Sequence, residues 1–162
     1  MKTKYLLLAF APFVMAEDTY IVGNVESKCV INTDTYGVYG NPTVGKLSTL
    51  PADGGVMPVI RYDVITGDAY TARITIPSDF STSPILNDRV VFDGSVSVKE
   101  VSDSAMSDYD TNKVEYDYTT EFNMHTAGTT WFKVDSNVLY GYNKAFPAGE
   151  YRSVVNADCI AK

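Results

Sequence analysis

The sequence predicts an all-β fold, a sandwich of short antiparallel strands, from three observations. Short segments rich in β-branched and aromatic residues alternate between apolar and polar side chains. Clusters of Gly, Pro, Asn and Asp separate these segments. No stretch keeps helical periodicity for more than one or two turns. About nine short strands at this spacing are typical of a sandwich, with a barrel as the alternative.

The first 16 residues have the features of a signal peptide. Lys2 and Lys4 form a basic start, and Tyr5 to Met15 is an apolar run too short to span a bilayer. Ala16 ends the run with a small residue before the acidic pair Glu17-Asp18. We expect residues 1–16 to be removed on export; a buried N-terminal helix is the alternative.

Length and charge restrict the partners. A chain of 162 residues fits one domain. Loss of residues 1–16 removes two lysines and no acids, which moves the net charge from −7 to −9. This acidity, without a basic patch, argues against nucleic acid and anionic membranes as partners. No later apolar run approaches membrane-spanning length.

The chain has two cysteines, Cys29 and Cys159. In an exported protein they most simply form one disulfide, while two free buried thiols are the alternative. The bond would close a loop of about 130 residues, and the chain-entropy model gives such a loop roughly 5 kcal/mol of stabilisation.

Residues 17–31 alternate as a strand does. Ile21, Gly23 and Val25 share one face with Cys29, and more polar residues occupy the other face. If Cys29 is tied to the last strand, residues 17–28 form a free arm ahead of a domain over residues 29–162. Alternatively, the arm is the ordinary first strand of a complete sandwich.

Turn residues dominate residues 32–50, which we expect to be loops with one short strand, and a turn follows at 51–55. Residues 56–66 and 70–76 form a predicted hairpin around Gly67-Asp68. In its second arm, alternate residues are apolar and should face the core: Tyr70, Ala72, Ile74 and Ile76.

The second half of the chain predicts further hairpins. After a loop at 78–88, Asp93-Gly94 separates residues 89–92 from 95–101, a pattern typical of a two-residue turn. An acidic loop at 102–112 precedes a strand at 113–119. Residues 121–125 and 129–134 flank Ala127-Gly128 as another hairpin. Short strands at 138–142 and 150–160 complete the set.

No catalytic constellation is visible, so we expect neither enzymatic activity nor a cofactor. His125 is the only histidine and has no nucleophile motif around it. No phosphate loop or dinucleotide motif is present. Asp108 begins a segment similar to a calcium loop, but Lys113 and Thr119 replace the required glycine and glutamate. We therefore expect no metal site.

Aromatic residues offer a weaker signal of binding. We expect the single tryptophan, Trp131, to lie in the core, because aromatic side chains fit half-buried strands. Tyr36, Tyr39, Tyr140 and Tyr142 flank glycines or lie close to them and are candidates for a binding face.

The arm Thr19 to Val25, Cys29 in the first strand, and Gly149-Glu150-Tyr151 opening the last strand resemble a chaperone–usher pilin subunit, of the archaic, spore-coat-protein-U-like kind. The resemblance implies an immunoglobulin-like sandwich that lacks its final strand and is completed by the arm of the next subunit, with Ile21, Gly23 and Val25 as the donated face. The chain differs in two respects. The second cysteine lies in the last strand, whereas these subunits usually pair their first cysteine with an early one, and the sequence Cys159-Ile160-Ala161-Lys162 lacks the aromatic residue usual near the end.

The resemblance further implies a fimbrial filament on the cell surface, reached through the periplasm. Its partners would be other copies of the chain, a periplasmic chaperone and an outer-membrane usher. The alternative function is a monomeric secreted or periplasmic ligand-binding module, for carbohydrate or calcium.

Overall fold

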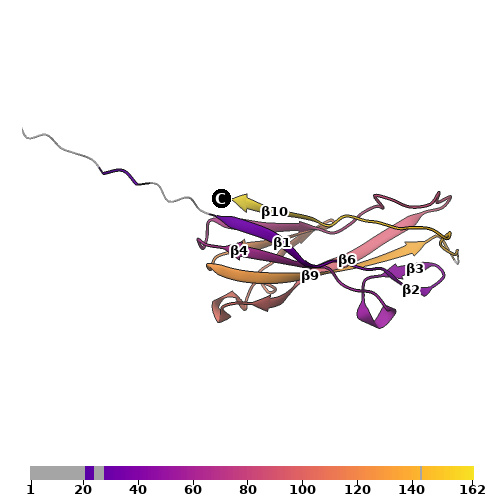
Figure 1. Cartoon of the computed structure of the whole chain (residues 1–162), viewed down its shortest axis with the longest axis horizontal. Coiled ribbons are helices and arrows are strands. Elements are labelled where there is room, and N and C mark those ends of the chain that lie inside the picture. The colour runs from indigo at the N-terminus through magenta and orange to yellow at the C-terminus, as the bar shows by residue number, and fades with distance from the viewer. Residues whose placement is uncertain (1–20, 24–27, 143) are drawn as a thin grey trace, which may run out of the picture.

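Two antiparallel sheets pack face to face in the computed structural model, as the sequence predicts (Figure 1). The structure describes residues 21–23, 28–142 and 144–162. The expected signal peptide and most of the expected arm lie outside these residues.

The first sheet is built around one long strand, β9 (Gly128–Tyr140). The strands beside it are β6 (Val90–Val101), β4 (Val59–Val64), β1 (Cys29–Thr35), β3 (Lys46–Ser48) and β2 (Gly40–Thr43). On one side β6 pairs with β9 along its length; on the other, β4 pairs with the first half of β9 and β3 with the second half. On that second side the outer strands are β1, beyond β4, and β2, beyond β3, and β6 is the outer strand on the first side.

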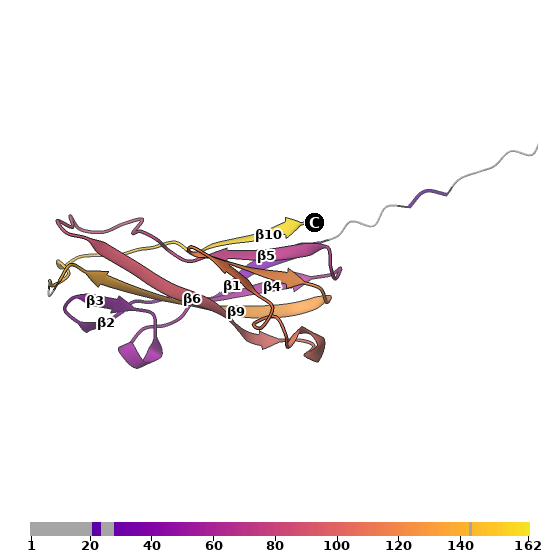
Figure 2. The ribbon, with the colours of Figure 1, turned by 180° about the vertical axis from the view of Figure 1, so that it is seen from behind.

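The second sheet has the order β10-β5-β8-β7. Its strands are β5 (Tyr70–Thr75), β7 (Val114–Tyr116), β8 (Thr119–Met124) and β10 (Asn156–Ala161). Figure 2 shows β10 and β5 side by side from behind. Single turns of 3-10 helix, η1 (Pro51–Asp53) and η2 (Ser104–Met106), lie in the connections.

The strand order is immunoglobulin-like. If β1, β4, β5, β6, β9 and β10 are lettered A to F, the first sheet contains A-B-E-D and the second contains C-F. The hairpin of β7 and β8 extends the second sheet on the far side of β5. A full immunoglobulin sandwich has a strand G paired with F. Within the described residues, no strand occupies that position beside β10.

Alternation along the strands builds the core, as predicted for β5. Tyr70, Ala72, Ile74 and Ile76 are all buried, opposite Phe132 and its inward neighbours on β9. Each large apolar side chain buried in this way contributes about 1.5–3 kcal/mol. A second, smaller cluster of Leu47, Phe92 and Val138 lies toward the other end of β9.

The predicted turn at Asp93-Gly94 is wrong, because β6 runs through it without a break. Gly94 pairs with Ser136 of β9. A Cβ at Gly94 would lie 2.3 Å from the carbonyl oxygen of Asp135. The glycine therefore permits close approach of two strands and does not form a turn.

Several other expectations need correction. The hairpins predicted from residues 56–66 with 70–76 and from residues 121–125 with 129–134 are wrong, because β4 and β9 lie in the first sheet whereas β5 and β8 lie in the second.

The separate strands predicted at 129–134 and 138–142 are one continuous strand, β9, which ends at Tyr140. Asp117, with φ of 50°, divides the predicted strand 113–119. Trp131 lies on the outer side of the first sheet, half-buried, where its indole N–H donates to Asp34 at 2.6 Å. The predicted last strand, 150–160, is regular only from Asn156.

The predicted disulfide between Cys29 and Cys159 is present. It joins the first residue of β1 to β10 and so links the two sheets at one end of the domain. Such bonds form in oxidising compartments.

Substituting Cys29 with serine should lower the free energy of unfolding by roughly 2–5 kcal/mol, because the unfolded chain regains the entropy of a long loop. Urea unfolding of the wild-type and Cys29→Ser proteins measures this difference. A loss below about 1 kcal/mol would contradict the structural role of the bond.

Tyr62 links the sheets through the core. Its fully buried hydroxyl, on β4, donates toward the carbonyl oxygens of Asp158 at 3.1 Å and Arg73 at 3.3 Å in the second sheet. Burial, followed by the charge of Asp158, raises the pKa of Tyr62 far above the ordinary tyrosine value of 10.0.

This pKa shift predicts a loss of stability in alkali. Because the folded-state pKa lies above the unfolded-state value, the contribution of Tyr62 is complete below pH 10 and falls as the pH rises beyond it. Tyr62→Phe should be less stable at pH 8 by about 1 kcal/mol but lose less stability between pH 8 and 11. Urea unfolding across that range tests this, with the exposed Tyr142→Phe as control. Equal losses of unfolding free energy between pH 8 and 11 in Tyr62→Phe and wild type would refute it.

Candidate functional site

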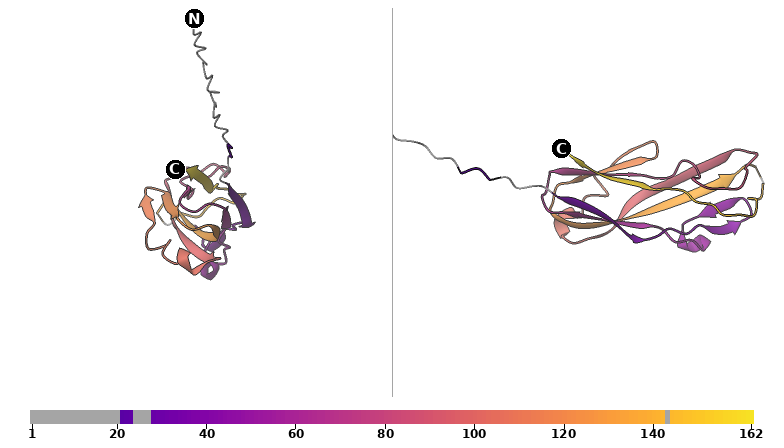
Figure 3. Two further views of the ribbon diagram at one scale, coloured as in Figure 1. Left: turned by 90° about the vertical axis from the view of Figure 1, so that its left-hand side faces the viewer. Right: turned by 45° about the horizontal axis from the view of Figure 1, so that its top comes forward.

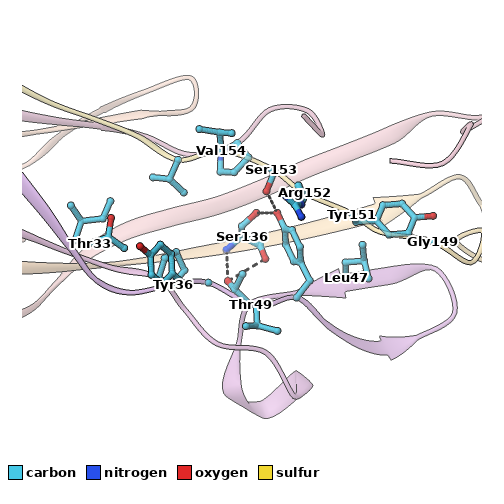
Figure 4. Close-up of a pocket in the computed structure, with 17 residues that line it drawn as sticks. Thr33, Tyr36, Leu47, Thr49, Ser136, Gly149, Tyr151, Arg152, Ser153 and Val154 are labelled. Atoms are coloured by element: carbon cyan, nitrogen blue, oxygen red, sulfur yellow. Dashed lines mark hydrogen bonds between the residues drawn. The ribbon is translucent and has the colours of Figure 1, made fainter. Parts of the chain in front are cut away.

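A groove of about 720 Å³ runs along the side of the sandwich. One wall is formed by residues 33–39, which follow from β1, and the other by residues 149–155, which lead into β10. Leu47, Ile60 and Pro77 are among the residues of its lining. Figure 4 shows the labelled lining residues.

The groove opens because β1 and β10 diverge. The two strands lie close at the disulfide end and separate toward the middle of the domain (Figure 3). The pairing of β1 with β4 shifts register between Thr33 and Thr35, and beyond it the chain leaves the sheet edge. It returns to make one isolated pair between Val38 and Val56.

The wall at residues 149–155 lacks a regular strand partner. Among these residues in the described structure, only Arg152 exchanges backbone hydrogen bonds outside the sheets, with Thr82 at 2.8 and 3.2 Å. The alternation of this segment looked like an ordinary strand in the sequence. It is irregular because no neighbouring strand is present to order it.

A polar bridge crosses the groove. The hydroxyl of Tyr39 lies 2.6 Å from that of Ser153 on the far wall and 3.0 Å from that of Ser136 on β9. A phenol has one proton, so Tyr39 can donate to at most one of the two serines, and each serine hydroxyl can donate to it in turn. The backbone N–H of Ser136 in turn donates to the hydroxyl of Thr49 at 2.8 Å. These groups form a polar layer between the two apolar clusters.

Exposed apolar side chains line the rest of the groove. Tyr36 is 81% exposed, Val38 54% and Val154 55%. Apolar side chains gathered on one concave surface are typical of a site that another chain or a ligand covers. Sequence reasoning identified Tyr36 and Tyr39 but missed Val38, Ser153 and Val154, because nothing in their alternation marks a strand without a partner.

Two of the three predicted donor residues lie in the described part of the arm. Ile21 is 98% exposed, and a Cβ at Gly23 would meet no atom within 4 Å. Val22, between them, is 90% exposed. Val25 lies outside the described residues. Residues 21–23 therefore make no packed strand with the domain to which they belong.

The other tyrosine candidates do not belong to the groove. Tyr140 is buried and stacks on Phe146, with ring centres 5.2 Å apart. Tyr142 is exposed beside Asp88 and Arg89. The four tyrosines therefore do not form one binding face.

His125 and the acidic loop form a structural contact. The Nε2 of His125 lies 3.0 Å from Asp108, and its ring packs edge-on against the buried Tyr109. The hydrogen bond with His125 lowers the pKa of Asp108. Across the described ranges, no group of three or more His, Cys, Asp or Glu side chains is arranged to hold a metal ion.

The same loop covers the free edge of β6. Asp110 accepts a hydrogen bond from the backbone N–H of Val98 at 3.0 Å, and Lys113 donates to the carbonyl oxygen of Val96 at 2.9 Å. Side chains that occupy edge groups in this way prevent a further strand from pairing there.

Comparison with family models and with curated protein sequences found no match. In the part of the chain that the structure describes, no helix is long and apolar enough to cross a membrane.

The Tyr39 bridge should stabilise the isolated domain. Tyr39→Phe removes both hydroxyl contacts and should lower the free energy of unfolding by roughly 1–2 kcal/mol, since each hydrogen bond contributes about 1 kcal/mol. The matched control is Tyr36→Phe on the same wall, where a change within about 0.5 kcal/mol is expected because its side chain is mostly exposed. Equal effects of the two substitutions in thermal or urea unfolding would show that the bridge contributes nothing.

Proposed function

We propose that the protein is a structural subunit of an extracellular filament, in which the arm of one copy, residues 17–28, adds a strand to the groove of the next. The observation that supports this most is the groove wall at residues 149–155, whose backbone lacks a regular strand partner beside exposed apolar side chains. An incomplete sheet of this kind is satisfied by β-strand addition.

The strand order supports the same proposal. Residues 149–155 lead into β10, the strand lettered F above, and the strand that pairs with F in an immunoglobulin sandwich is G. The groove runs along residues 149–155, so a donated strand would occupy the part of the strand G position that precedes β10. A strand supplied from outside would complete both the sheet and the core at that position.

The arm has the pattern that such a strand needs. Ile21, Gly23 and Val25 recur at period two, so an extended arm turns all three toward one side. Burying Ile21 and Val25 in the groove would contribute about 1.5–3 kcal/mol each before entropy is counted. Backbone hydrogen bonds to both walls would add to this.

The edge of β6 is protected, whereas the groove wall at residues 149–155 is not, and this difference supports the proposal. The fold covers the edge of β6 with Asp110 and Lys113, whereas the groove walls keep apolar side chains exposed. Natural sandwiches protect edges that would otherwise aggregate. An edge left available beside an apolar groove fits a strand that arrives during assembly.

In this proposal the role is structural and not enzymatic. Export through residues 1–16 would deliver the chain to the periplasm, where the disulfide forms. A periplasmic chaperone would cover the groove before assembly, and an outer-membrane usher would pass subunits to the cell surface.

A second candidate function is a monomeric ligand-binding module. The groove volume falls within the range of small-molecule sites, and its lining includes exposed aromatic surface at Tyr36. The two functions differ in one observation: a donated strand predicts a heat-resistant ladder of copies in electrophoresis, whereas the module predicts a monomer.

Charge on the inward face of the arm should prevent assembly. Ile21→Asp or Val25→Asp places an unpaired charge in the groove, a cost of several kcal/mol, and should abolish the ladder. The matched control is Val22→Asp, on the opposite face of the same strand, which should assemble as the wild type does. Thermal unfolding of the unassembled domain should be the same for the Ile21→Asp and Val22→Asp variants, because residues 21–23 pack against nothing there.

Two results would overturn the proposal. One is a wild-type protein that remains monomeric at high concentration and does not respond to an added peptide of residues 17–28. The other is a loss of domain stability in Ile21→Asp that matches its loss of assembly, which would make the arm an internal strand.

A further inference from the structure

We propose that the Cys29–Cys159 disulfide closes one end of the groove and sets how far the arm of a second copy can enter. This inference rests on the proposed function and concerns the register of the donated strand.

The spacing of the two edges supports this closure. Adjacent strands lie about 4.8 Å apart, so two strands with a third between them are separated by roughly 9.6 Å. The Cα atoms of Cys29 and Cys159 are only 6.4 Å apart. No strand fits between β1 and β10 at that level, and the covalent bond prevents the edges from separating.

The remaining open length is short. The groove wall runs from Gly149 to Val155, and beyond Val155 the chain enters β10 and reaches the disulfide. About seven extended residues, or roughly 23 Å, fit along it. Such a segment turns three or four side chains inward. The arm segment Thr19 to Val25 has this length and contains Ile21, Gly23 and Val25.

The closure also fixes the direction of entry. Each arm leaves its own domain just before Cys29, at the closed end (Figure 1). A donated arm must enter a neighbour from the opposite end, near Gly149, with its N-terminus leading. It then runs antiparallel to residues 149–155, and Thr19 comes to rest near the disulfide. Successive copies therefore point the same way.

The test uses the mature chain carrying Ile21→Asp and Val25→Asp, whose arm cannot fill the groove of another copy, with the native disulfide intact. Synthetic peptides of residues 19–25 are compared with versions lengthened at the N-terminus by four alternating Thr and Val residues. Backbone hydrogen exchange and binding affinity are measured for each. We expect protection at residues 33–39 and 149–155, none added at 29–32 or 157–161, and affinities within about threefold, because the added residues find no edge to pair with.

A matched variant tests the disulfide itself. With Cys29→Ser and Cys159→Ser added, the lengthened peptide should gain protection at residues 29–32 and bind roughly tenfold tighter than the short one, as new backbone hydrogen bonds form. If this variant does not fold, the peptide series on the disulfide-bonded protein still tests whether the donated strand stops before the disulfide.

The outcomes separate the two proposals. Protection of residues 29–32 by the lengthened peptide in the disulfide-bonded protein, with at least tenfold tighter binding, would overturn the depth limit but leave the donated strand in place. Failure of every peptide to bind would overturn the donated strand, and the depth limit with it.

Discussion

Backbone groups need partners, and this sandwich has one segment, residues 149–155, where the described structure supplies almost none. The segment runs beside apolar side chains on the opposite wall, so water and exposed hydrophobic surface meet along its length. Water can hydrogen-bond the exposed backbone, but the exposed apolar surface is unfavourable, and a single added strand would pair the backbone and cover that surface. Within the described residues the segment has no regular strand partner, and its path is irregular.

Polar and covalent contacts also join the two sheets beside the groove, and most of them lie at one end of the domain. At one end the disulfide and the hydroxyl of Tyr62 hold β1 and β4 to β10. In the groove, the hydrogen bond between Tyr39 and Ser153 is the one that joins the two walls among the described residues. The domain can therefore keep its fold while one side is open, provided that the closed end is strong. Cys159, in the last strand, supplies part of that strength through its disulfide with Cys29.

Sequence patterns predicted the class of fold and the disulfide, because both depend on local alternation and on a count of two cysteines. The inward face of β5 was predicted residue by residue for the same reason. Asp93-Gly94 was misread because a glycine that permits strand contact looks the same as one in a turn. The resemblance implied an incomplete sheet, but alternation did not locate the groove: whether Val155 belongs to a paired strand depends on which segments are its neighbours, and alternation gives no information on neighbours. Trp131 was misplaced because a half-buried outer position with Asp34 as partner also suits an aromatic residue.

A cryo-electron microscopy map of the assembled protein tests the central claim most directly. The account predicts a strand from a neighbouring copy between residues 33–39 and 149–155, with Ile21, Gly23 and Val25 facing the core and every copy pointing the same way. An assembly in which that groove stays empty and copies touch through other surfaces would contradict it.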